Sequence, residues 1–554
     1  MGRVTRLRVQ NFRSVKEPVE VRFPQDAPLV LVGENNTGKS NLVRALELVL
    51  GESWPGTHEP EDHEFYNRDT KLQIQITVAL EGVTDPRRGA NVEQLMWRYP
   101  VDDGRPFRMV LDNGQESLYV SNEVREQCVC IVVGADRRLS YQLSYISKYT
   151  FLSKLMRKFH QALTSDAKRV IDLRARFDEV KVLFQEVGPF AVFADELQKQ
   201  IEELSGNLEY RLGVDFSAYD PSNYFHALRV LPHQGNDVRT FEELGTGQEQ
   251  LLALSFAYAY AKAFHSEGCG LIVVVEEPEA HLHPLAQKWV GQKIHDLARE
   301  GVQVVVTTHS PAFLDLMGLE GIAVLRKDQD ATRVVQLSRN ELAQHCRNHG
   351  ATKAKDDSIL PFYAAAATEE ILTGFFARKV VIVEGPTESL ALPIYLSRVG
   401  LDPTKEGVAI LPVHGVGNLS KWWRLFTAYC IPVYVIFDND TSDDPNNVKR
   451  TDILQTLAVP QGSVKELLDT TDWIVGNRLT VFGANFEATM HSYFGQAYTD
   501  LEEKARSEYG LSLEQSKPLV ARYVAENLPY DEQNRGWQRA KVLADKIKRI
   551  AVVR

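Results

Sequence analysis

The sequence is poor in cysteine and has no long apolar run, and each absence narrows the classes of protein to which it can belong. The 554 residues include five scattered cysteines and no CxxC pair. This excludes a disulfide scaffold and a zinc ribbon, and Cys128 and Cys130 are predicted to be buried strand residues. No stretch reaches the roughly 18 apolar residues of a membrane-spanning helix. The N-terminal residues lack the apolar core of a signal peptide, so we expect a cytoplasmic protein without a membrane segment.

Basic residues are outnumbered by acidic ones. The chain has 63 Lys and Arg against 74 Asp and Glu, a net charge of −11. The molecule as a whole therefore repels nucleic acid, which must bind to a local basic surface. With 44% hydrophobic and 25% charged residues the composition is that of a folded protein, and the length corresponds to about three or four domains.

The hydrophobic pattern divides the chain into four segments. Residues 1–150 and 209–370 contain apolar strands and amphipathic helices, and are predicted to be two parts of one α/β domain. Residues 151–208 have apolar residues at helical spacing, which predicts an inserted helical hairpin, either a solvent-facing arm or a dimerisation element. Residues 371–554 return to alternating strands and helices after an alanine-rich segment at 361–376, which is predicted as one helix. This alternation implies a second parallel sheet.

Residues 33–40 read GENNTGKS, a complete GxxxxGK[ST] sequence between a predicted buried strand and an amphipathic helix. The glycines of such a loop let backbone N–H groups point at phosphate oxygens. Lys39 is predicted to reach the β- and γ-phosphates of ATP, and Ser40 to hold Mg²⁺. The nucleotide-binding residues expected in this loop are Gly33, Asn35, Asn36, Gly38, Lys39 and Ser40.

Two acids end the apolar strand that begins at residue 270. A charge at the end of a buried strand is unfavourable unless it meets a cation, so Glu276 is predicted to position Mg²⁺ and Glu277 to polarise the attacking water. Thr308-His309-Ser310 ends the next strand, where His309 is expected to contact the γ-phosphate. The alternative is a solvated loop with two acids and a structural histidine, which the P-loop argues against.

A glycine-rich turn precedes a long apolar helix near residue 250, and a turn of this kind is a second anion cradle. Its expected phosphate contacts are Gly245, Thr246, Gly247 and Gln248. The P-loop, this turn, the strand-end acids and the histidine occur in an order that resembles the ATPase head of the ABC class, in its chromosome-maintenance and repair branch. The segments NFRS at 11–14 and EPEAHLHP at 277–284 resemble the same branch. The resemblance implies that the turn completes the ATP site of a second subunit, and hence a homodimer.

The head departs from its class at two positions. The turn reads LGTGQ where LSGGQ is usual, so Gly245 or Thr246 must replace the serine contact, and Glu276 stands where aspartate is usual. The longer side chain of Glu276 is expected to alter the Mg²⁺ geometry and to slow hydrolysis. The Q-loop residue has no clear counterpart, and EDHEFYN at 61–67 is the favoured region.

Carboxylates also follow two strands of the last segment. They are Glu384 and Glu388 after one strand, and Asp438 and Asp440 after the other. The carboxyl ends of parallel strands meet at one edge of a sheet. Oxygen ligands without His or Cys favour Mg²⁺ or Mn²⁺, and such clusters support two-metal phosphodiester chemistry. The pattern resembles the Toprim domain shared by topoisomerases, primases and some nucleases.

An ABC-type head followed by a Toprim domain resembles the overcoming-lysogenization-defect (OLD) nuclease family over essentially the whole chain. The resemblance implies that Glu487 completes the metal set of Glu384, Glu388, Asp438 and Asp440, with Glu384 and Asp438 central to catalysis. It also places Lys517, in Ser-Lys-Pro at 516–518, where it stabilises negative charge on phosphorus. The alternatives are a first-turn helix glutamate for Glu487 and an ordinary surface lysine for Lys517.

A basic run from Arg539 to Arg554 predicts a helix whose basic face either binds DNA phosphates or is merely solvated. Trp422 and Trp423 lie near the proposed metal edge, and for them core packing is favoured over base stacking. Nothing resembles a helix-turn-helix reader, so we expect little direct sequence readout.

Together these patterns predict an ATP-hydrolysing, metal-dependent DNA endonuclease that forms a homodimer, with a further protein partner left open. The resemblance implies a role in phage defence or DNA repair. One alternative is an ABC-type DNA clamp with an inactive Toprim domain, which the complete carboxylate set opposes. Another is a topoisomerase or primase, for which a further domain with a nucleophilic tyrosine or a zinc ribbon would be needed. A transporter ATPase leaves the last segment without a role.

Overall fold

The computed structural model describes residues 2–51, 53–133, 165–185, 270–280, 282–356, 358–442, 444–510 and 516–552, with a few single residues and two short strands between 134 and 269. The chain divides into two compact units, Met1–Cys130 with Phe264–Arg554, and Ile131–Ala263. The second unit contains α5 (Ala167–Gln185) and the antiparallel pair β10 (His233–Gln234) and β11 (Asp237–Val238). Helix α5 lies within the predicted hairpin. The rest of that hairpin and the turn at 245–248 lie outside the described residues.

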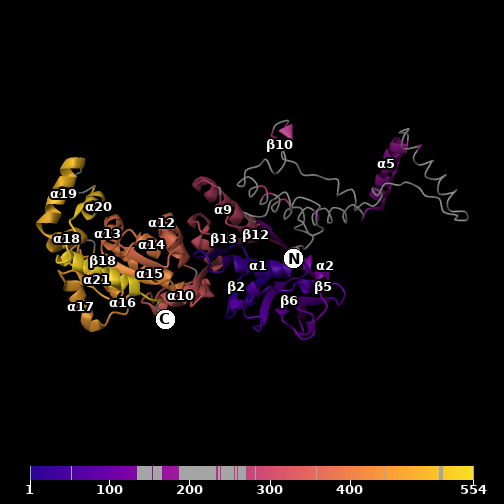
Figure 1. Ribbon diagram of the computed structural model, residues 1–554, viewed down its shortest axis with the longest axis horizontal. Coiled ribbons are helices and arrows are strands. Elements are labelled where there is room, and N and C mark those ends of the chain that lie inside the picture. Colours follow the sequence, from indigo (N-terminus) through magenta and orange to yellow (C-terminus); the bar gives the residue numbers. More distant parts are fainter. Residues whose placement is uncertain are drawn as a thin grey trace, which may run out of the picture. The chain divides into compact units, whose positions relative to one another are not determined.

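An antiparallel sheet forms one layer of the ATPase part of the first unit (Figure 1). Its strand order is β2-β1-β4-β6-β7-β8, with β5 beside β6. The alternating pattern of β1 puts Leu7 and Val9 on the buried face, and a register shift between Val4 and Arg6 lets Val4 be buried as well. The strands are β1 (Arg3–Gln10), β2 (Val19–Arg22), β4 (Ile74–Glu81), β5 (Thr84–Asp85), β6 (Ala90–Tyr99), β7 (Phe107–Leu111) and β8 (Glu116–Ser117).

A second, mixed sheet carries the predicted nucleotide loop. Its order is β15-β14-β3-β13-β12-β9, and β12, β13, β3 and β14 run parallel. The strands are β3 (Leu29–Val32), β9 (Cys128–Val133), β12 (Gly270–Glu276), β13 (Gln303–Thr308), β14 (Ile322–Asp328) and β15 (Ala331–Gln336). Helices of this part are α1 (Lys39–Leu50), α2 (Asn122–Arg125) and α9 (Pro284–Arg299). Cys128 and Cys130 are both buried in β9, as predicted.

The connection to the last domain differs from the prediction. The alanine-rich segment forms three short helices, not one, namely α11 (Leu360–Ala366), α12 (Glu369–Leu372) and the 3-10 helix η10 (Thr373–Phe376). Ala367 is extended, and the Thr368 side chain accepts a hydrogen bond from the Ile371 N–H, so a new helix is capped there. Helix α10 (Arg339–Asn348) precedes this segment.

The Toprim part is built on a five-stranded sheet with the order β17-β16-β18-β20-β19. Neighbouring strands are parallel except for the short edge strand β19. The strands are β16 (Lys379–Val383), β17 (Val408–Pro412), β18 (Val433–Asp438), β19 (Ile474–Val475) and β20 (Leu479–Phe482). The parallel sheet predicted from the sequence is therefore present, with one antiparallel strand added.

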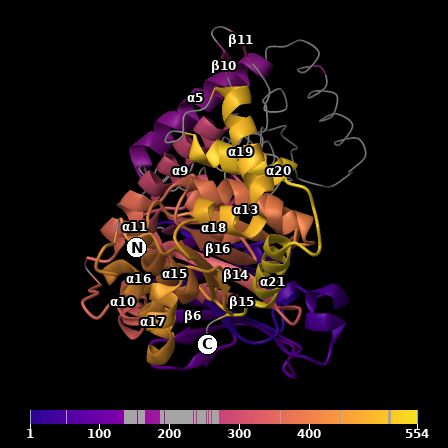
Figure 2. The same cartoon turned by 90° about the vertical axis from the view of Figure 1, so that its left-hand side faces the viewer.

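Helices cover both faces of this sheet (Figure 2). One core joins residues of the strands to α13 (Pro386–Arg398), α18 (Phe486–Phe494), α20 (Lys517–Asn527) and α21 (Arg535–Arg549). The other face packs on α15 (Val416–Ala428), where Trp422 and Trp423 are at most 1% exposed, which confirms the core prediction. The remaining helices are α14 (Pro403–Glu406), α16 (Val448–Thr456), α17 (Gln461–Asp469) and α19 (Gln496–Tyr509). In the described part of the chain, no helix combines the length and apolarity needed to cross a membrane.

Candidate functional site

The loop at 33–38 leaves β3 and enters α1 in the conformation of a phosphate cradle. Asn36 and Gly38 have φ values of 64° and 105°, in the left-handed region that glycine adopts most easily. A Cβ at Gly33 would lie 2.3 Å from the Leu325 carbonyl oxygen on β14, so the loop rests directly on the neighbouring strand. Among the described residues no side chain caps α1, which leaves its first N–H groups to an anion.

Lys39 is held at this loop by backbone carbonyls. Its Nζ donates to the carbonyl oxygens of Gly33 and Glu34 at 2.8 and 2.9 Å. Burial lowers the pKa of Lys39 to about 8, although the charges of Glu277 and Glu279 oppose this shift. Phosphate oxygens would replace the two carbonyls as acceptors for the ammonium group.

The ends of β12 and β13 bring the predicted catalytic acids and the histidine to the same edge. Strand β13 lies between β12 and β3, and Glu276 pairs with Thr307. Glu277 has a φ of 48°, and its N–H donates to the Thr307 carbonyl at 2.8 Å. Burial and the nearby Lys39 charge lower the pKa of His309, whereas the charges of Glu279 and Glu277 oppose them. The neutral imidazole is therefore favoured at His309.

Glu279 is a site residue that sequence reasoning did not single out. One of its carboxylate oxygens accepts a hydrogen bond from the His309 N–H at 2.6 Å, and the other accepts from Thr308 Oγ1 at 2.8 Å. Glu279 thus fixes the end of β13 relative to the end of β12. The signal was the third acid of the EEPE sequence, but its partner lies 30 residues away.

The NFRS segment at 11–14 holds the nucleotide loop through side-chain hydrogen bonds. Ser14 Oγ lies 2.7 Å from Thr332 Oγ1 and accepts from Asn41 Nδ2 at 2.6 Å, while Thr332 Oγ1 donates to the Thr37 carbonyl. Arg13 pairs with Glu64 at 3.4 Å, inside the segment favoured for the Q-loop. The signature residues Gly245, Thr246, Gly247 and Gln248 lie outside the described residues, so they remain predictions.

Three of the predicted Toprim carboxylates meet at the carboxyl edge of the second sheet. Glu384 follows β16, and its Oε1 accepts the Asp438 N–H at 2.8 Å. Asp438 ends β18, and its Oδ2 accepts the Phe486 N–H at 3.1 Å. Glu388 is only 6% exposed and accepts the Gly385 N–H at 3.1 Å. Each of these carboxylates therefore accepts a hydrogen bond from a backbone N–H group.

Repulsion at this edge shows in the pKa values. Burial, together with the charges of Glu384 and Glu487, raises the pKa of Glu388 to about 7. The pKa of Asp438 is raised well above its usual value by burial and then by Glu388 and Glu384. A buried cluster of acids that repel one another is unfavourable unless a cation joins it.

The outer members of the predicted set lie around this centre. Glu487 is in the first turn of α18, which Asn485 caps, and its charge reaches Glu388 and Asp438. Asp440 is exposed, and hydrogen bonds from Ser442 lower its pKa most, with a further contribution from the Lys517 charge. The structure therefore brings Lys517, at the start of α20, near the DxD segment.

The donor set fits a hard divalent cation. Asp438 Oδ1 is buried and has no hydrogen-bond partner among the described residues, which is unfavourable for a carboxylate oxygen that no cation meets. Among the described residues, no three His, Cys, Asp or Glu side chains already stand in metal-binding geometry, so small rotations must accompany binding. All the candidate ligands are oxygen atoms, as Mg²⁺ and Mn²⁺ prefer. The ligands would be Glu384, Glu388, Asp438, Asp440 and Glu487.

Arg450 is a second residue that sequence reasoning missed. Its side chain is fully buried, and it donates to Asn439 Oδ1 at 3.3 Å and to the Asp444 carbonyl at 2.9 Å. It also lies 3.5 Å from Asp444 Oδ2 and donates to Asn447. Asn439 is the middle residue of the DxD sequence, so Arg450 holds the loop that presents Asp440. An arginine in the first turn of a helix such as α16 would ordinarily be exposed.

Arg450→Met is expected to destabilise the protein by about 3–5 kcal/mol, because it leaves Asp444 buried without its partner. A matched control is Arg522→Met, which removes the exposed pair of Arg522 and Glu526 and should change stability by less than about 1 kcal/mol. Thermal unfolding of the full chain measures both. Equal melting temperatures for the two variants would show that Arg450 does not stabilise this loop.

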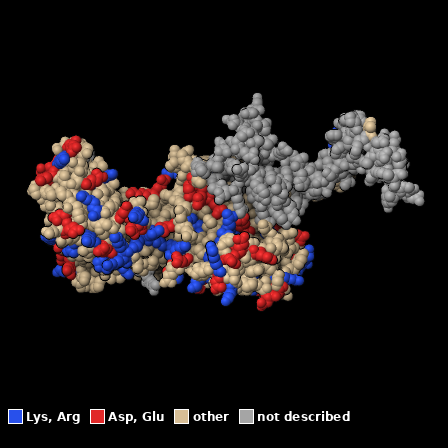
Figure 3. All heavy atoms as spheres, viewed as in Figure 1, with Lys and Arg blue, Asp and Glu red and all other residues tan. Residues whose placement is uncertain are grey.

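The basic C-terminal helix lies at the other edge of the sheet. Figure 3 shows lysine and arginine side chains gathered over α21. Lys379, the first residue of β16, donates to the Lys548 carbonyl, and Lys546 donates to Asn477 at 2.6 Å. Strand β16 therefore separates this basic surface from Glu384 by roughly 17 Å, at about 3.3 Å per residue. Val542 on this helix is 39% exposed.

The comparisons with known proteins agree with both halves of this description. A model of an AAA ATPase domain matches residues 3–168 and 131–314, and a model of an overcoming lysogenization defect protein-like TOPRIM domain matches residues 375–440. An OLD nuclease of Thermus scotoductus is 25% identical over 78% of this chain and 81% of its own length. The Old nuclease of Escherichia phage P2 is 20% identical over 82% and 80%, and the endonuclease GajA of Bacillus cereus is 21% identical over 74% and 70%.

Fold and motifs together define an ATPase head joined to a Toprim domain, the fold class predicted from the sequence. The head contributes the P-loop and the strand-end acids, and the Toprim domain contributes the carboxylate edge. The chain belongs to the AAA ATPase domain family over its head, carries an OLD-like Toprim segment, and is similar to OLD nucleases over most of its length.

Proposed function

We propose that the protein is an ATP-binding and ATP-hydrolysing DNA endonuclease whose Toprim edge cleaves phosphodiester bonds with Mg²⁺ or Mn²⁺. The observation that carries the proposal is the buried, unpartnered Oδ1 of Asp438 amid carboxylates that raise each other's pKa. An inactive Toprim domain would have no reason to retain this unfavourable arrangement. The nuclease names of relatives that align over most of their length support the same activity.

The residues divide the work between binding the metal and stabilising the phosphate. Glu384, Glu388 and Asp438 would hold the central metal, and Asp440 and Glu487 would complete the set. When bound, two divalent ions activate water and stabilise the leaving oxygen. Lys517, whose charge acts on Asp440, would neutralise charge on a non-bridging phosphate oxygen.

At the ATP site, Lys39 would bind the phosphates, while Ser40 and Glu276 would hold Mg²⁺. Glu277 would orient the attacking water, and neutral His309 would contact the γ-phosphate. The signature turn at 245–248 would come from a second copy of the chain in a homodimer.

DNA is the proposed substrate, and the basic surface of α21 is the proposed distal contact to its phosphates. A further protein partner is left open. A role in phage defence or DNA repair rests on the family alone.

Metal binding and cleavage are expected to increase as the pH rises through about 7, because Glu388 loses its proton there. In the unfolded chain Glu388 has its usual pKa of 4.5. Protonated Glu388 therefore contributes its full share to the free energy of unfolding below pH 4.5, and this contribution is lost as the pH rises through about 7. Mn²⁺ should therefore raise the melting temperature more at pH 8 than at pH 6. Glu388→Gln should flatten this difference, and an equal Mn²⁺ effect at both pH values in the wild type would contradict the assignment.

The test of function is a time course of supercoiled plasmid with Mg²⁺ or Mn²⁺, with and without ATP. We expect nicked or linear product that EDTA abolishes. ATP hydrolysis without any cleavage in either metal would instead favour a DNA clamp with an inactive Toprim domain.

A further inference from the structure

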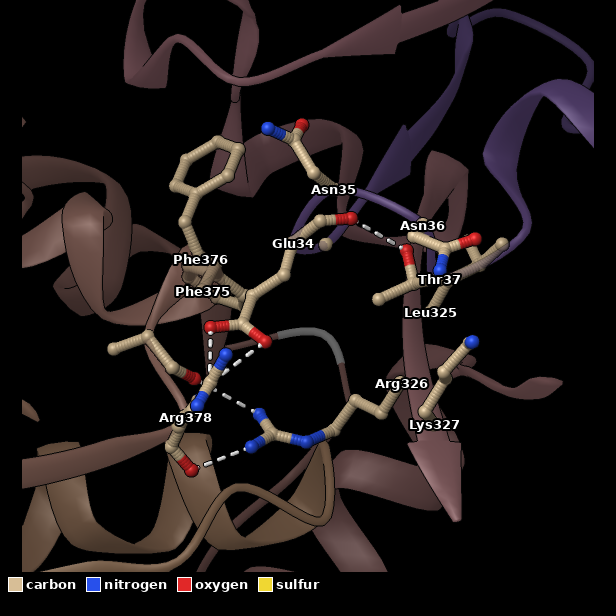
Figure 4. A pocket seen from close by; sticks show the side chains of 12 residues that line it. Glu34, Asn35, Asn36, Thr37, Leu325, Arg326, Lys327, Phe375, Phe376 and Arg378 are labelled. Carbon is tan, nitrogen blue, oxygen red and sulfur yellow. Dashed lines mark hydrogen bonds and ion pairs between the residues drawn. The ribbon is translucent and has the colours of Figure 1, made fainter. Parts of the chain in front are cut away.

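The nucleotide loop and the first strand of the Toprim domain are joined by an ion pair. Arg378 immediately precedes β16, and its Nε lies 2.8 and 3.0 Å from the two carboxylate oxygens of Glu34, in the P-loop (Figure 4). Gly407, before β17, packs beside both side chains, since a Cβ there would lie 3.0 Å from Arg378 and 3.3 Å from Glu34. The contact therefore joins the P-loop to two adjacent Toprim strands at their N-terminal ends.

A second link reaches the same point through β14. Gly33 rests on the carbonyl of Leu325, and the next residue, Arg326, donates to the carbonyl oxygens of Ala377 and Arg378 at 3.1 and 2.5 Å. Burial lowers the pKa of Arg326, and the Glu34 charge opposes this shift. A movement of the P-loop therefore changes both the side-chain and the backbone surroundings of Arg378.

The P-loop has two alternative sets of partners for its lysine. Lys39 is bonded to the carbonyl oxygens of Gly33 and Glu34. Phosphate binding would draw the ammonium group away and free both carbonyls, one of which belongs to the residue paired with Arg378. A cavity of about 480 Å³ between the loop and residues 375–378 gives the Glu34 side chain room to move.

Strand β16 extends from this junction to the catalytic edge. Arg378 precedes its first residue, and Glu384 follows its last. Glu384 is in turn bonded to the Asp438 N–H. Strand β16 thus connects Arg378, which pairs with the P-loop, to the carboxylates proposed to bind metal.

We propose that Arg378 is a positioning residue that transmits nucleotide binding from Glu34 and Arg326, through β16, to Glu384. The ATP dependence of cleavage then originates within one chain and does not require a contact supplied by a second copy. This inference rests on the proposed function only for its catalytic readout.

Hydrogen–deuterium exchange tests the relay without any cleavage. AMP-PNP with Mg²⁺ should change deuterium uptake in residues 33–44 and in residues 373–384 of the wild type. In Arg378→Gln the first change should remain and the second should disappear. Arg333→Gln, which breaks the exposed pair of Arg333 with Asp328, is the matched control and should behave as wild type. The relay would be overturned if deuterium uptake at 373–384 changed in Arg378→Gln as it does in the wild type, or if it did not change in the wild type.

Cleavage gives the second readout. The ratio of cleavage rates with and without ATP should move at least about fivefold toward one in Arg378→Gln, with ATP hydrolysis retained. Arg378→Lys keeps a charge beside Glu34 and should retain most of the ratio. Arg378 and Glu34 are 61% and 38% exposed, so losing their pair affects folding little. The relay would be contradicted if the ratio of cleavage rates with and without ATP were unchanged in Arg378→Gln, or if it were one in the wild type. A wild type that cleaves no DNA would contradict the proposed function, and the exchange experiment alone would then decide the relay.

Discussion

Asp438→Asn is expected to reduce DNA cleavage by about a thousandfold or more while leaving ATP hydrolysis intact. Asp438 is held by the Phe486 N–H at one oxygen and presents the other, unpartnered, to the proposed metal. Metal ions supply several kcal/mol of charge stabilisation in phosphoryl chemistry, and each 1.4 kcal/mol corresponds to about tenfold in rate. The asparagine is nearly isosteric, so the loss would come from the missing charge. Single-turnover cleavage of plasmid in Mn²⁺ measures the effect.

The matched control is Asp500→Asn, which changes an exposed acid on α19 that is bonded to Gln496. It should cleave as the wild type does. Cleavage by Asp438→Asn at the wild-type rate, in protein that folds normally, would show that the Toprim edge is not the nuclease centre. Loss of cleavage in both variants would instead indicate that cleavage depends on the overall charge of the protein, not on this site.

Lys39→Ala is expected to abolish ATP hydrolysis and to weaken ATP binding by about 10- to 150-fold. The estimate follows from the loss of one charge-assisted hydrogen bond, worth about 1.5–3 kcal/mol. The pKa of Lys39 is about 8, because burial lowers it, so wild-type affinity should also fall as the pH rises above 8 and the ammonium loses its proton. Fluorescence titration with a labelled ATP analogue measures both effects.

Lys293→Ala removes an exposed lysine of α9 that pairs with Asp296, and serves as the control. Its ATP affinity should equal that of the wild type. Hydrolysis that persists in Lys39→Ala would show that residues 33–40 are not the ATP site. In the same variant, cleavage without ATP should remain, because Lys39 belongs to the head and does not contact the carboxylates of the Toprim edge.

Features that depend on short stretches of sequence were predictable. The P-loop, the acids after β12 and the carboxylates after β16 and β18 each follow an apolar strand directly, and parallel strands bring such ends to one edge. The burial of Trp422 and Trp423 was also the favoured prediction. Local pattern and tertiary structure agree at these positions.

Features that depend on distant partners were not predictable. The role of Glu279 requires the adjacency of β12 and β13, and the burial of Arg450 requires Asn439 and Asp444 to fold around it. The four alanines of the segment have high helix propensity, yet the Thr368 cap divides the segment into separate helices. Similarly, charge alone left open whether the basic face of α21 binds DNA or is merely solvated, and only the sheet topology shows that this surface lies opposite the carboxylate edge.

The most direct test of the central claim is the amount of Mn²⁺ bound by the nucleotide-free protein at pH 8, measured by electron paramagnetic resonance. Omitting nucleotide keeps ATP from bringing metal to the head. The account predicts that the wild type binds Mn²⁺, that Mg²⁺ competes with it, and that Asp438→Asn loses this binding while Asp500→Asn retains it. Binding that is undiminished in Asp438→Asn, or absent from the wild type, would contradict a metal-dependent nuclease centre at the ends of β16 and β18.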